Sequence, residues 1–156
     1  MNIRTIMASD REPLREMLQR IEQFQPSEVT VALELIDGSI ADSKGSGYGC
    51  LVATEGAAVL GYICFGPTPM TESTFDLYWI AVSPDAQGRG LGKQIYAAFE
   101  AHIKRAHATH VRIETSSKEL YAATGGFYAR LGFDVAGRLP DFYAPSDDLL
   151  IFYRAI

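Results

Sequence analysis

The sequence predicts an α+β fold, a mixed central sheet of about six or seven strands flanked by about four helices. Apolar residues recur at two spacings, one typical of strands and one typical of helices, in the order β-α-α-β-β-β-α-β-α-β-β. No repeat, low-complexity tract or linker divides the 156 residues, which are 47% hydrophobic and 21% charged. We therefore expect one domain spanning residues 1–156, long enough to bury a substantial core.

The first part of the chain predicts a strand followed by two helices. Residues Ile3–Ile6 form a short apolar-alternating strand. Ser9 and Glu12 fit a capping box at the start of the first helix. Pro26 then ends that helix and opens a second one. The apolar side of the second helix is formed by Val29, Leu33, Ile36 and Ile40.

The middle of the chain predicts three strands after a glycine-rich loop at Gly45–Gly49. Two apolar runs flank a short turn at Glu55-Gly56, which is typical of a β-hairpin. Thr74–Val82 is a further strand, rich in aromatic and branched residues. Cys50 and Cys64 lie in the hairpin runs without metal-site spacing, so we expect both to be reduced and buried.

The last part begins with a glycine cluster, Gln87–Gly92, that opens a long helix. The later elements are, in order, that helix from Leu91 to beyond Ile103, a strand at Val111–Thr115, a helix at Leu120–Leu131 ended by Gly132, and strands at Asp134–Arg138 and Leu149–Arg154. The segment DFYAPSDD is expected to form the loop between the two final strands.

A strand that runs into a glycine-rich turn and a helix is an anion-binding device, because the first helical amides lack internal partners. The Walker A spacing fails at both ends, where Gln87 and Gln94 stand. The dinucleotide fingerprint fails because its third glycine, Gly92, comes one residue early. A third pattern, [QR]-x-x-G-x-[GA], matches Gln87–Gly92 fully.

This motif follows a strand ending in IAVSP, and about 40 residues later Phe127-Tyr128-Ala-Arg-Leu-Gly-Phe133 matches a second pattern, F-Y-x-x-x-G-F. Together with the element order, the two motifs resemble the GNAT family of N-acetyltransferases over essentially the whole chain. The resemblance implies an acyl-CoA-dependent N-acyltransferase that moves an acetyl group from acetyl-CoA to an amine of a small molecule or peptide. It also implies direct attack in a ternary complex.

The resemblance assigns residues to coenzyme A binding. These are the strand amides of Ile80, Ala81 and Val82, then Gln87, Gly88, Arg89, Gly90, Leu91, Gly92 and Lys93 around the pyrophosphate. Many members carry an asparagine seven residues before the conserved tyrosine, and here that position is Tyr121. Tyr121, with Ser117 or Thr124 as a substitute hydroxyl, is therefore expected to contact the pantetheine.

Two residues are predicted to be catalytic. Tyr128 matches the tyrosine that protonates the leaving thiolate, and a tyrosine hydroxyl stays protonated at neutral pH. Asp76 lies eleven residues before Gln87, where histone-type members carry a glutamate base. Glu72, Glu114 and ordered water remain alternatives for the base.

Composition excludes other partners. The 14 basic and 19 acidic residues give a net charge of −5 without any basic run, which argues against nucleic acid. No apolar run approaches the ~20 residues of a membrane span and no signal peptide is apparent, so we expect a cytoplasmic protein. The spacing of His102, His107 and His110 does not predict a metal site.

The acceptor site is expected between the first two helices and the last β-β loop. Acidic and aromatic residues there suit a small cationic amine: Glu28, Glu34, Asp37, Asp141, Phe142, Tyr143, Asp147 and Asp148. A non-catalytic acyl-CoA-binding or regulatory module is the alternative function, and a nucleotide-binding protein is a weaker third. The resemblance is also compatible with a homodimer.

Overall fold

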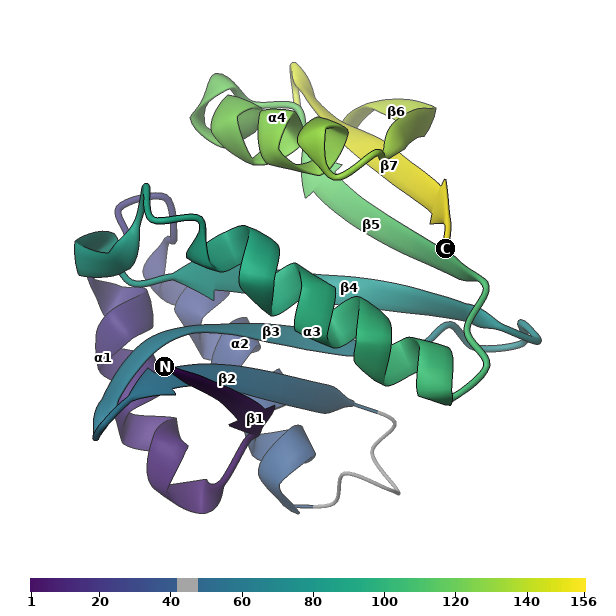
Figure 1. Ribbon diagram of the computed structural model, residues 1–156. Helices are drawn as coiled ribbons and strands as arrows, with labels where there is room; N and C mark the ends of the chain where they lie inside the picture. The colour runs from purple at the N-terminus through teal and green to yellow at the C-terminus, as the bar shows by residue number, and fades with distance from the viewer. Residues whose placement is uncertain (42–47) are drawn as a thin grey trace.

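A computed structural model describes residues 1–41 and 48–156 (Figure 1). One seven-stranded sheet has the order β1-β2-β3-β4-β5-β7-β6. Its strands are β1 (Asn2–Thr5), β2 (Gly49–Glu55), β3 (Ala58–Pro67), β4 (Thr74–Val82), β5 (His110–Ser116), β6 (Asp134–Ala144) and β7 (Asp147–Ala155). The helices are α1 (Arg11–Gln19), α2 (Pro26–Ala41), α3 (Leu91–Arg105) and α4 (Ala122–Arg130), with short 3-10 turns η1 (Ala8–Asp10), η2 (Pro84–Ala86) and η3 (Glu119–Tyr121).

The sheet is mixed because β4 and β5 are parallel, whereas the other neighbouring strands pair antiparallel. The parallel pairing runs only from Thr74 opposite His110 to Leu77 opposite Ile113. Beyond that point the two strands diverge, and their separation is visible in Figure 1. We call the place where pairing stops, after Leu77 on β4 and after Ile113 on β5, the fork.

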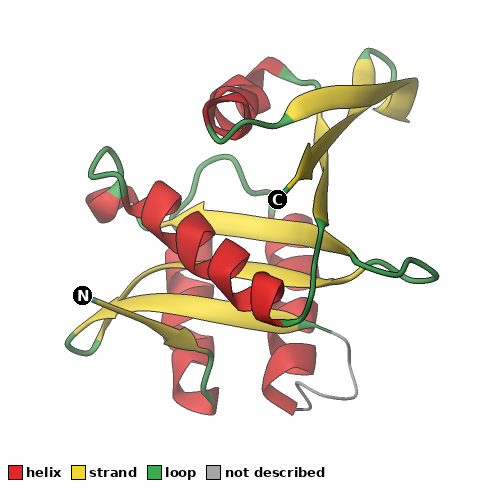
Figure 2. Ribbon diagram, turned by 45° about the vertical axis from the view of Figure 1, so that its right-hand side comes forward, coloured by secondary structure: helices red, strands yellow, loops and turns green. Residues whose placement is uncertain are grey.

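The helices cover the two faces of the sheet separately. Figure 2 shows α3 in front of the sheet and α1 and α2 behind it. Two apolar cores follow from this arrangement, one that includes Phe99 of α3 and Tyr128 of α4, and one that includes Leu14 of α1 and Ile36 of α2. Gly61 lets α3 approach β3 closely, because a Cβ there would lie 2.8 Å from the Ile95 side chain of α3.

The N-terminal elements confirm the predicted order and correct one detail. The predicted Ser9–Glu12 capping box is wrong, because the helical segment begins earlier, with η1. Asp10 fills the reciprocal role, since its carboxylate accepts a hydrogen bond of 2.7 Å from the Met7 amide. Glu12 instead pairs with Arg15 one turn further along α1.

The predicted hairpin is confirmed as β2 and β3, and Gly56 in its turn has a φ of 58°. Cys50 and Cys64 are directly opposite in this hairpin, free and buried, as expected. Of the predicted glycine-rich loop Gly45–Gly49, residues 45–47 lie outside the described residues, and Gly49 already belongs to β2.

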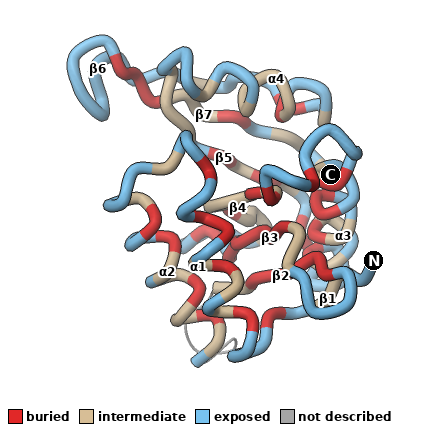
Figure 3. Tube along the Cα trace, turned by 90° about the vertical axis from the view of Figure 1, so that its left-hand side faces the viewer, coloured by how far each residue is buried: buried red, intermediate tan, exposed pale blue. Residues whose placement is uncertain are grey.

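The C-terminal elements differ from the prediction at two places. The helix predicted from Leu120 begins at Ala122, after η3, and Gly132 follows its end with a φ of 89°. The predicted eight-residue loop is largely strand, since β6 runs to Ala144 and β7 starts at Asp147. Ser146, with a φ of 64°, completes the tight turn. Figure 3 shows that β6 is mostly exposed. Because an exposed strand buries neither face, its sequence lacks the apolar alternation from which a strand is predicted.

Candidate active site

Beyond the fork, β4 presents one edge that no strand of the described chain covers. The hydrogen bond from the Ser83 amide to the Leu60 carbonyl of β3 shows which backbone groups of β4 face β3 and which face the open edge. Backbone groups alternate along a strand, so those of Val82 and Ile80 face the open edge. The backbone groups of Ala81 face β3 instead, opposite Tyr62.

The open edge leads directly into the glycine turn. Gly88 and Gly90 adopt φ of 75° and 74°, in the left-handed region that favours glycine. Gly90 is the N-cap of α3 and supplies no side-chain hydrogen bond. In the described chain, none of the backbone amides of residues 88–93 donates to a backbone carbonyl. The first amide that does is that of Gln94, which donates to the Gly90 carbonyl. The turn is therefore a set of free donors at the positive end of a helix.

Two further glycine-cluster residues fix the surroundings of this turn. The Gln87 side-chain amide donates to the Val82 carbonyl at 3.2 Å and so ties the turn to the end of β4. Gly92 faces the Phe127 ring, and a Cβ at this position would lie 3.3 Å from it. The absence of a side chain at Gly92 therefore lets α4 approach the first turn of α3.

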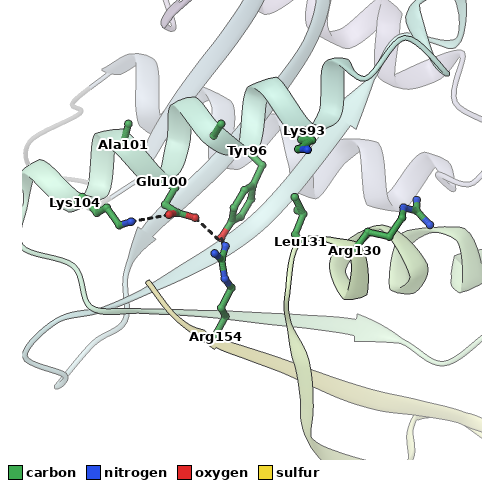
Figure 4. Close-up of a pocket in the computed structure, with 9 residues that line it drawn as sticks. Lys93, Tyr96, Glu100, Ala101, Lys104, Arg130, Leu131 and Arg154 are labelled. Carbon is green, nitrogen blue, oxygen red and sulfur yellow. Dashed lines mark hydrogen bonds and ion pairs between the residues drawn. The ribbon is translucent and has the colours of Figure 1, made fainter.

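A cavity of about 380 Å³ extends from the first turn of α3 along the side that faces α4 and β7 (Figure 4). In Figure 4, Lys93 and Arg130 lie toward one end, and Lys104 and Arg154 lie toward the other. Arg154 is held by Glu100 at 2.9 Å and by the Tyr96 hydroxyl at 3.1 Å. The lining is thus predominantly basic and suited to an anionic ligand.

Arg130 and Arg154 were missed by the sequence reasoning, because Arg130 occupies a variable position of the second motif and Arg154 lies outside both motifs. Arg154 is 58 residues from Tyr96 along the chain. Arg89, in contrast, lines a smaller hollow beside Leu60 and Leu91 rather than this cavity.

Tyr128 lies in the core at the level of the fork. Its ring centroid is 5.5 Å from that of Phe152, which is the β7 partner of Ile113, the last β5 residue paired to β4. The residue is 4% exposed, and its hydroxyl has no hydrogen-bond partner among the described residues. Burial among aromatic rings raises the pKa of Tyr128 above its ordinary value. The hydroxyl is therefore a proton donor throughout the neutral range.

Asp76 lies on the paired side of the fork. Its two carboxylate oxygens accept hydrogen bonds from the Arg112 guanidinium, at 2.7 Å from Nε and 3.1 Å from Nη2. The side chain is only 10% exposed. This bidentate ion pair joins β4 to β5. Because both carboxylate oxygens are occupied, the carboxylate is poorly placed to accept a proton from a substrate.

Glu114 is the first β5 residue beyond the fork. Its side chain is 45% exposed, and the nearest cation is the Arg112 Nη1 at 3.8 Å. Because Val111 and Ile113 are buried in the core on the α3 side, Glu114 lies on the opposite face of β5. Burial and the neighbouring carboxylates of Glu114 and Asp147 raise the pKa of Tyr143, which places this β6 tyrosine nearby.

The two hydroxyls expected at the pantetheine are engaged elsewhere. The Tyr121 hydroxyl donates to Glu28 Oε1 at 2.7 Å, and this bond joins η3 to the start of α2. Burial and this hydrogen bond raise the pKa of Tyr121. The Ser117 hydroxyl accepts from the Asp148 amide at 2.8 Å. Both hydroxyls therefore take part in contacts within the protein.

The structure brings together only part of the predicted acceptor set. Glu28, Asp147 and Tyr143 gather around Tyr121 and Glu114. Asp37 instead pairs with Arg11 at 2.6 Å, and Asp148 pairs with Arg138 at 2.5 Å. These two carboxylates therefore have structural partners.

Comparison with known sequences and structures decides the family. A family model described as an acetyltransferase (GNAT) domain matches residues 46–135, which include both motifs. The chain belongs to the GNAT acetyltransferase family. An L-methionine sulfoximine/L-methionine sulfone acetyltransferase from Pseudomonas aeruginosa is 35% identical over 99 residues. That match covers 60% of this chain and 55% of the relative.

Solved structures agree over the whole fold. A GNAT-family protein from Desulfovibrio desulfuricans is 36% identical, with a TM-score of 0.95 over 99% of this chain and 98% of that one. A structure from Salmonella typhimurium, solved with its cofactor acetyl-CoA, has a TM-score of 0.75 and 21% identity over 99% and 93% of the two chains. The second likeness concerns the fold alone.

No group of three or more His, Cys, Asp or Glu side chains within residues 1–41 and 48–156 could hold a metal ion. No helix in the same ranges is long and apolar enough to cross a membrane.

Proposed function

We propose that this GNAT-family chain is an acetyl-CoA-dependent N-acetyltransferase that acts by direct transfer in a ternary complex. One observation carries the proposal: the uncovered edge of β4 runs straight into the uncapped glycine turn of α3. A strand edge offers backbone donors and acceptors to the amide-containing pantetheine arm, and the turn offers free amides to a diphosphate. The two surfaces are continuous, as one extended ligand requires.

The residues present fit coenzyme A along its length. Ile80 and Val82 would pair with the pantetheine, and the amides of residues 88–93 would bind the pyrophosphate. Lys93 and Arg130, at the mouth of the basic cavity, would bind the phosphate on the ribose. Gln87 acts within the turn, where it fixes the end of β4.

Tyr128 supplies the proton for the leaving thiolate. As the nitrogen–carbon bond forms and the carbon–sulfur bond breaks, the tyrosine O–H donates to sulfur. The raised pKa favours the neutral hydroxyl in the folded protein. The contribution of this pKa shift to the free energy of unfolding is fully present below the pKa of tyrosine in the unfolded chain, about 10. It is lost as the pH rises through the pKa of Tyr128 in the folded protein. Neutral to mildly alkaline solution therefore leaves Tyr128 able to donate.

The acceptor is an amine of a small molecule or peptide. Acidic and tyrosyl side chains on the side of the fork that faces α2 support a cationic amine. The Pseudomonas relative is named for L-methionine sulfoximine and L-methionine sulfone, so these two compounds belong in the acceptor panel. Two free, buried thiols support the cytoplasm as the location, and a homodimer remains compatible with this assignment.

Thermal unfolding with added ligands tests the proposal. Acetyl-CoA and CoA at a hundredfold excess over Kd should stabilise the fold by about 2.7 kcal/mol, a rise in Tm of roughly 5–10 °C, and NAD should not. Release of free thiol with an amine panel then tests turnover. Absence of a shift with either CoA compound would contradict the proposal, whereas binding without turnover would favour the acyl-CoA-binding module.

A further inference from the structure

The carboxylates near the fork differ in whether hydrogen bonds and ion pairs within the protein already occupy their oxygens. Four carboxylates lie on β4 and β5 or around the acceptor side of the fork, Glu28, Asp76, Glu114 and Asp147, and Glu72 lies in the turn before β4. The distinction matters because an alkylammonium acceptor is protonated at neutral pH and must lose a proton before its nitrogen can attack. A carboxylate already saturated with donors is poorly placed to take that proton.

Two candidates from the sequence are unsuited to this role. Both oxygens of Asp76 are occupied by Arg112 on the paired side of the fork. Glu72 lies in the turn that precedes Thr74, the first residue of β4, whereas the fork follows Leu77. The strand between them separates Glu72 from the fork by several residues of about 3.3 Å each.

Two carboxylates near the fork are also committed. Glu28 accepts from the Tyr121 hydroxyl on one oxygen and from the Gln25 amide, at 2.7 Å, on the other. Asp147 accepts a hydrogen bond from the Ser116 hydroxyl and lies 3.4 Å from Lys118 Nζ. Its side chain is only 6% exposed. Both carboxylates therefore stabilise the fold on the acceptor side of the fork.

Glu114 remains, and its position is suited to the reaction. It is the first β5 residue released from the parallel pairing, so its side chain lies where the open edge of β4 begins. Tyr128 lies at the same level on the opposite face of the sheet, against the β7 partner of Ile113. An acetyl group held along β4 would therefore have a proton donor on one side and Glu114 on the other.

The local charges select the kind of acceptor. Asp76 and Arg112 neutralise one another, as do Asp147 and Lys118. Glu28 is bonded to neutral donors, and Glu114 shares Arg112 with Asp76, at 3.8 Å from Arg112 Nη1. The acceptor side therefore carries a net negative charge, which is complementary to an alkylammonium.

We propose that Glu114 binds the ammonium of a primary alkylamine acceptor and takes up its proton, an inference that rests on the proposed transferase function. The nitrogen loses two protons in the reaction. The first passes from the ammonium to the Glu114 carboxylate before attack; the nitrogen–carbon bond then forms as the carbon–sulfur bond breaks, and the Tyr128 proton passes to sulfur. The second proton leaves the acylated nitrogen and returns to the Tyr128 oxygen, and Glu114 releases its proton to water.

The test compares Glu114→Gln with Glu72→Gln, a matched loss of one carboxylate from an exposed turn. Each is assayed with the best alkylamine of the panel and with hydroxylamine, which is already unprotonated at pH 8 and needs no base. We expect Glu114→Gln to lower kcat with the alkylamine about a hundredfold and with hydroxylamine less than about fivefold. The acetyl-CoA thermal shift should be unchanged, and Glu72→Gln should behave as the parent protein.

Several outcomes would overturn the assignment. Equal losses with both acceptors would show that Glu114 only supports the fold of the site. Full activity of Glu114→Gln, or a loss confined to Glu72→Gln, would place the base elsewhere or leave the proton to water. These results presuppose a parent protein that binds acetyl-CoA and turns over, so they are distinguishable from failure of the transferase proposal, in which the parent itself shows no shift.

Discussion

The two sides of the fork use the same kinds of residue in opposite ways. Before the fork, β4 and β5 share a hydrogen-bonded ladder, and Asp76 and Arg112 join the strands by two further hydrogen bonds. Beyond it, the backbone groups of Ile80 and Val82 lack a neighbouring strand, and Glu114 is nearly half exposed. A carboxylate in the paired part contributes to the fold, whereas one in the diverging part is available to a ligand.

The physical reason is the satisfaction of polar groups. Buried donors and acceptors must be paired, so the closed part of the sheet has no unsatisfied capacity left for a substrate. The diverging part has backbone groups that water can reach, apart from the Val82 carbonyl that accepts from Gln87. A ligand can replace that water at little cost. Three substitutions separate the two roles.

Tyr128→Phe should have the largest effect, and it acts at the level of the fork. Removing the hydroxyl withdraws the proton donor while the ring keeps its contacts with Phe133 and Phe152. We expect kcat to fall by about 10²–10⁴-fold, the acetyl-CoA thermal shift to persist and the Tm to change little. Steady-state kinetics with a free-thiol readout measures the loss. Retention of more than about a third of the parent kcat would remove Tyr128 from the mechanism.

Asp76→Asn should have an intermediate effect, on stability rather than chemistry. The substitution leaves the Arg112 guanidinium with a neutral and weaker partner in a mostly buried position. We expect a loss of about 1.5–3 kcal/mol, or a Tm lower by roughly 5 °C, with kcat of the folded protein within about threefold of the parent. Thermal unfolding and kinetics below the transition measure both. An unchanged Tm with a collapse of kcat would return Asp76 to the role of base.

Arg130→Ala should have the smallest effect, confined to the nucleotide end of the ligand. Loss of one partly solvated cation from the cavity should raise the KM for acetyl-CoA about three- to tenfold and leave kcat unchanged. Lys118→Ala, near Asp147 rather than the cavity, is the charge-matched control and should leave this KM unaltered. A lower kcat in Arg130→Ala would instead mean that α4, and Tyr128 with it, had moved.

The elements with strong periodicity could be predicted from the sequence. Thr74–Val82 is confirmed to the residue, and the hairpin of β2 and β3 is confirmed in its pairing. The capping box failed because Asp10, three residues after Met7, competes with the Ser9–Glu12 pattern for the same helix start. Strand β6 was cut short because its residues are exposed and interrupted by Pro140, which removes the alternation that identifies a strand.

The sequence by itself determined the family, the order of the elements, the glycine turn and the position of Tyr128, because these depend on residues close together along the chain. Only the tertiary structure decided which acidic residues remain available. Asp76 and Arg112 are 36 residues apart, and Tyr121 and Glu28 are 93 apart, so their pairing follows from strand order and helix packing. A carboxylate's role depends on the donors that reach it, and local sequence does not specify donors from distant strands.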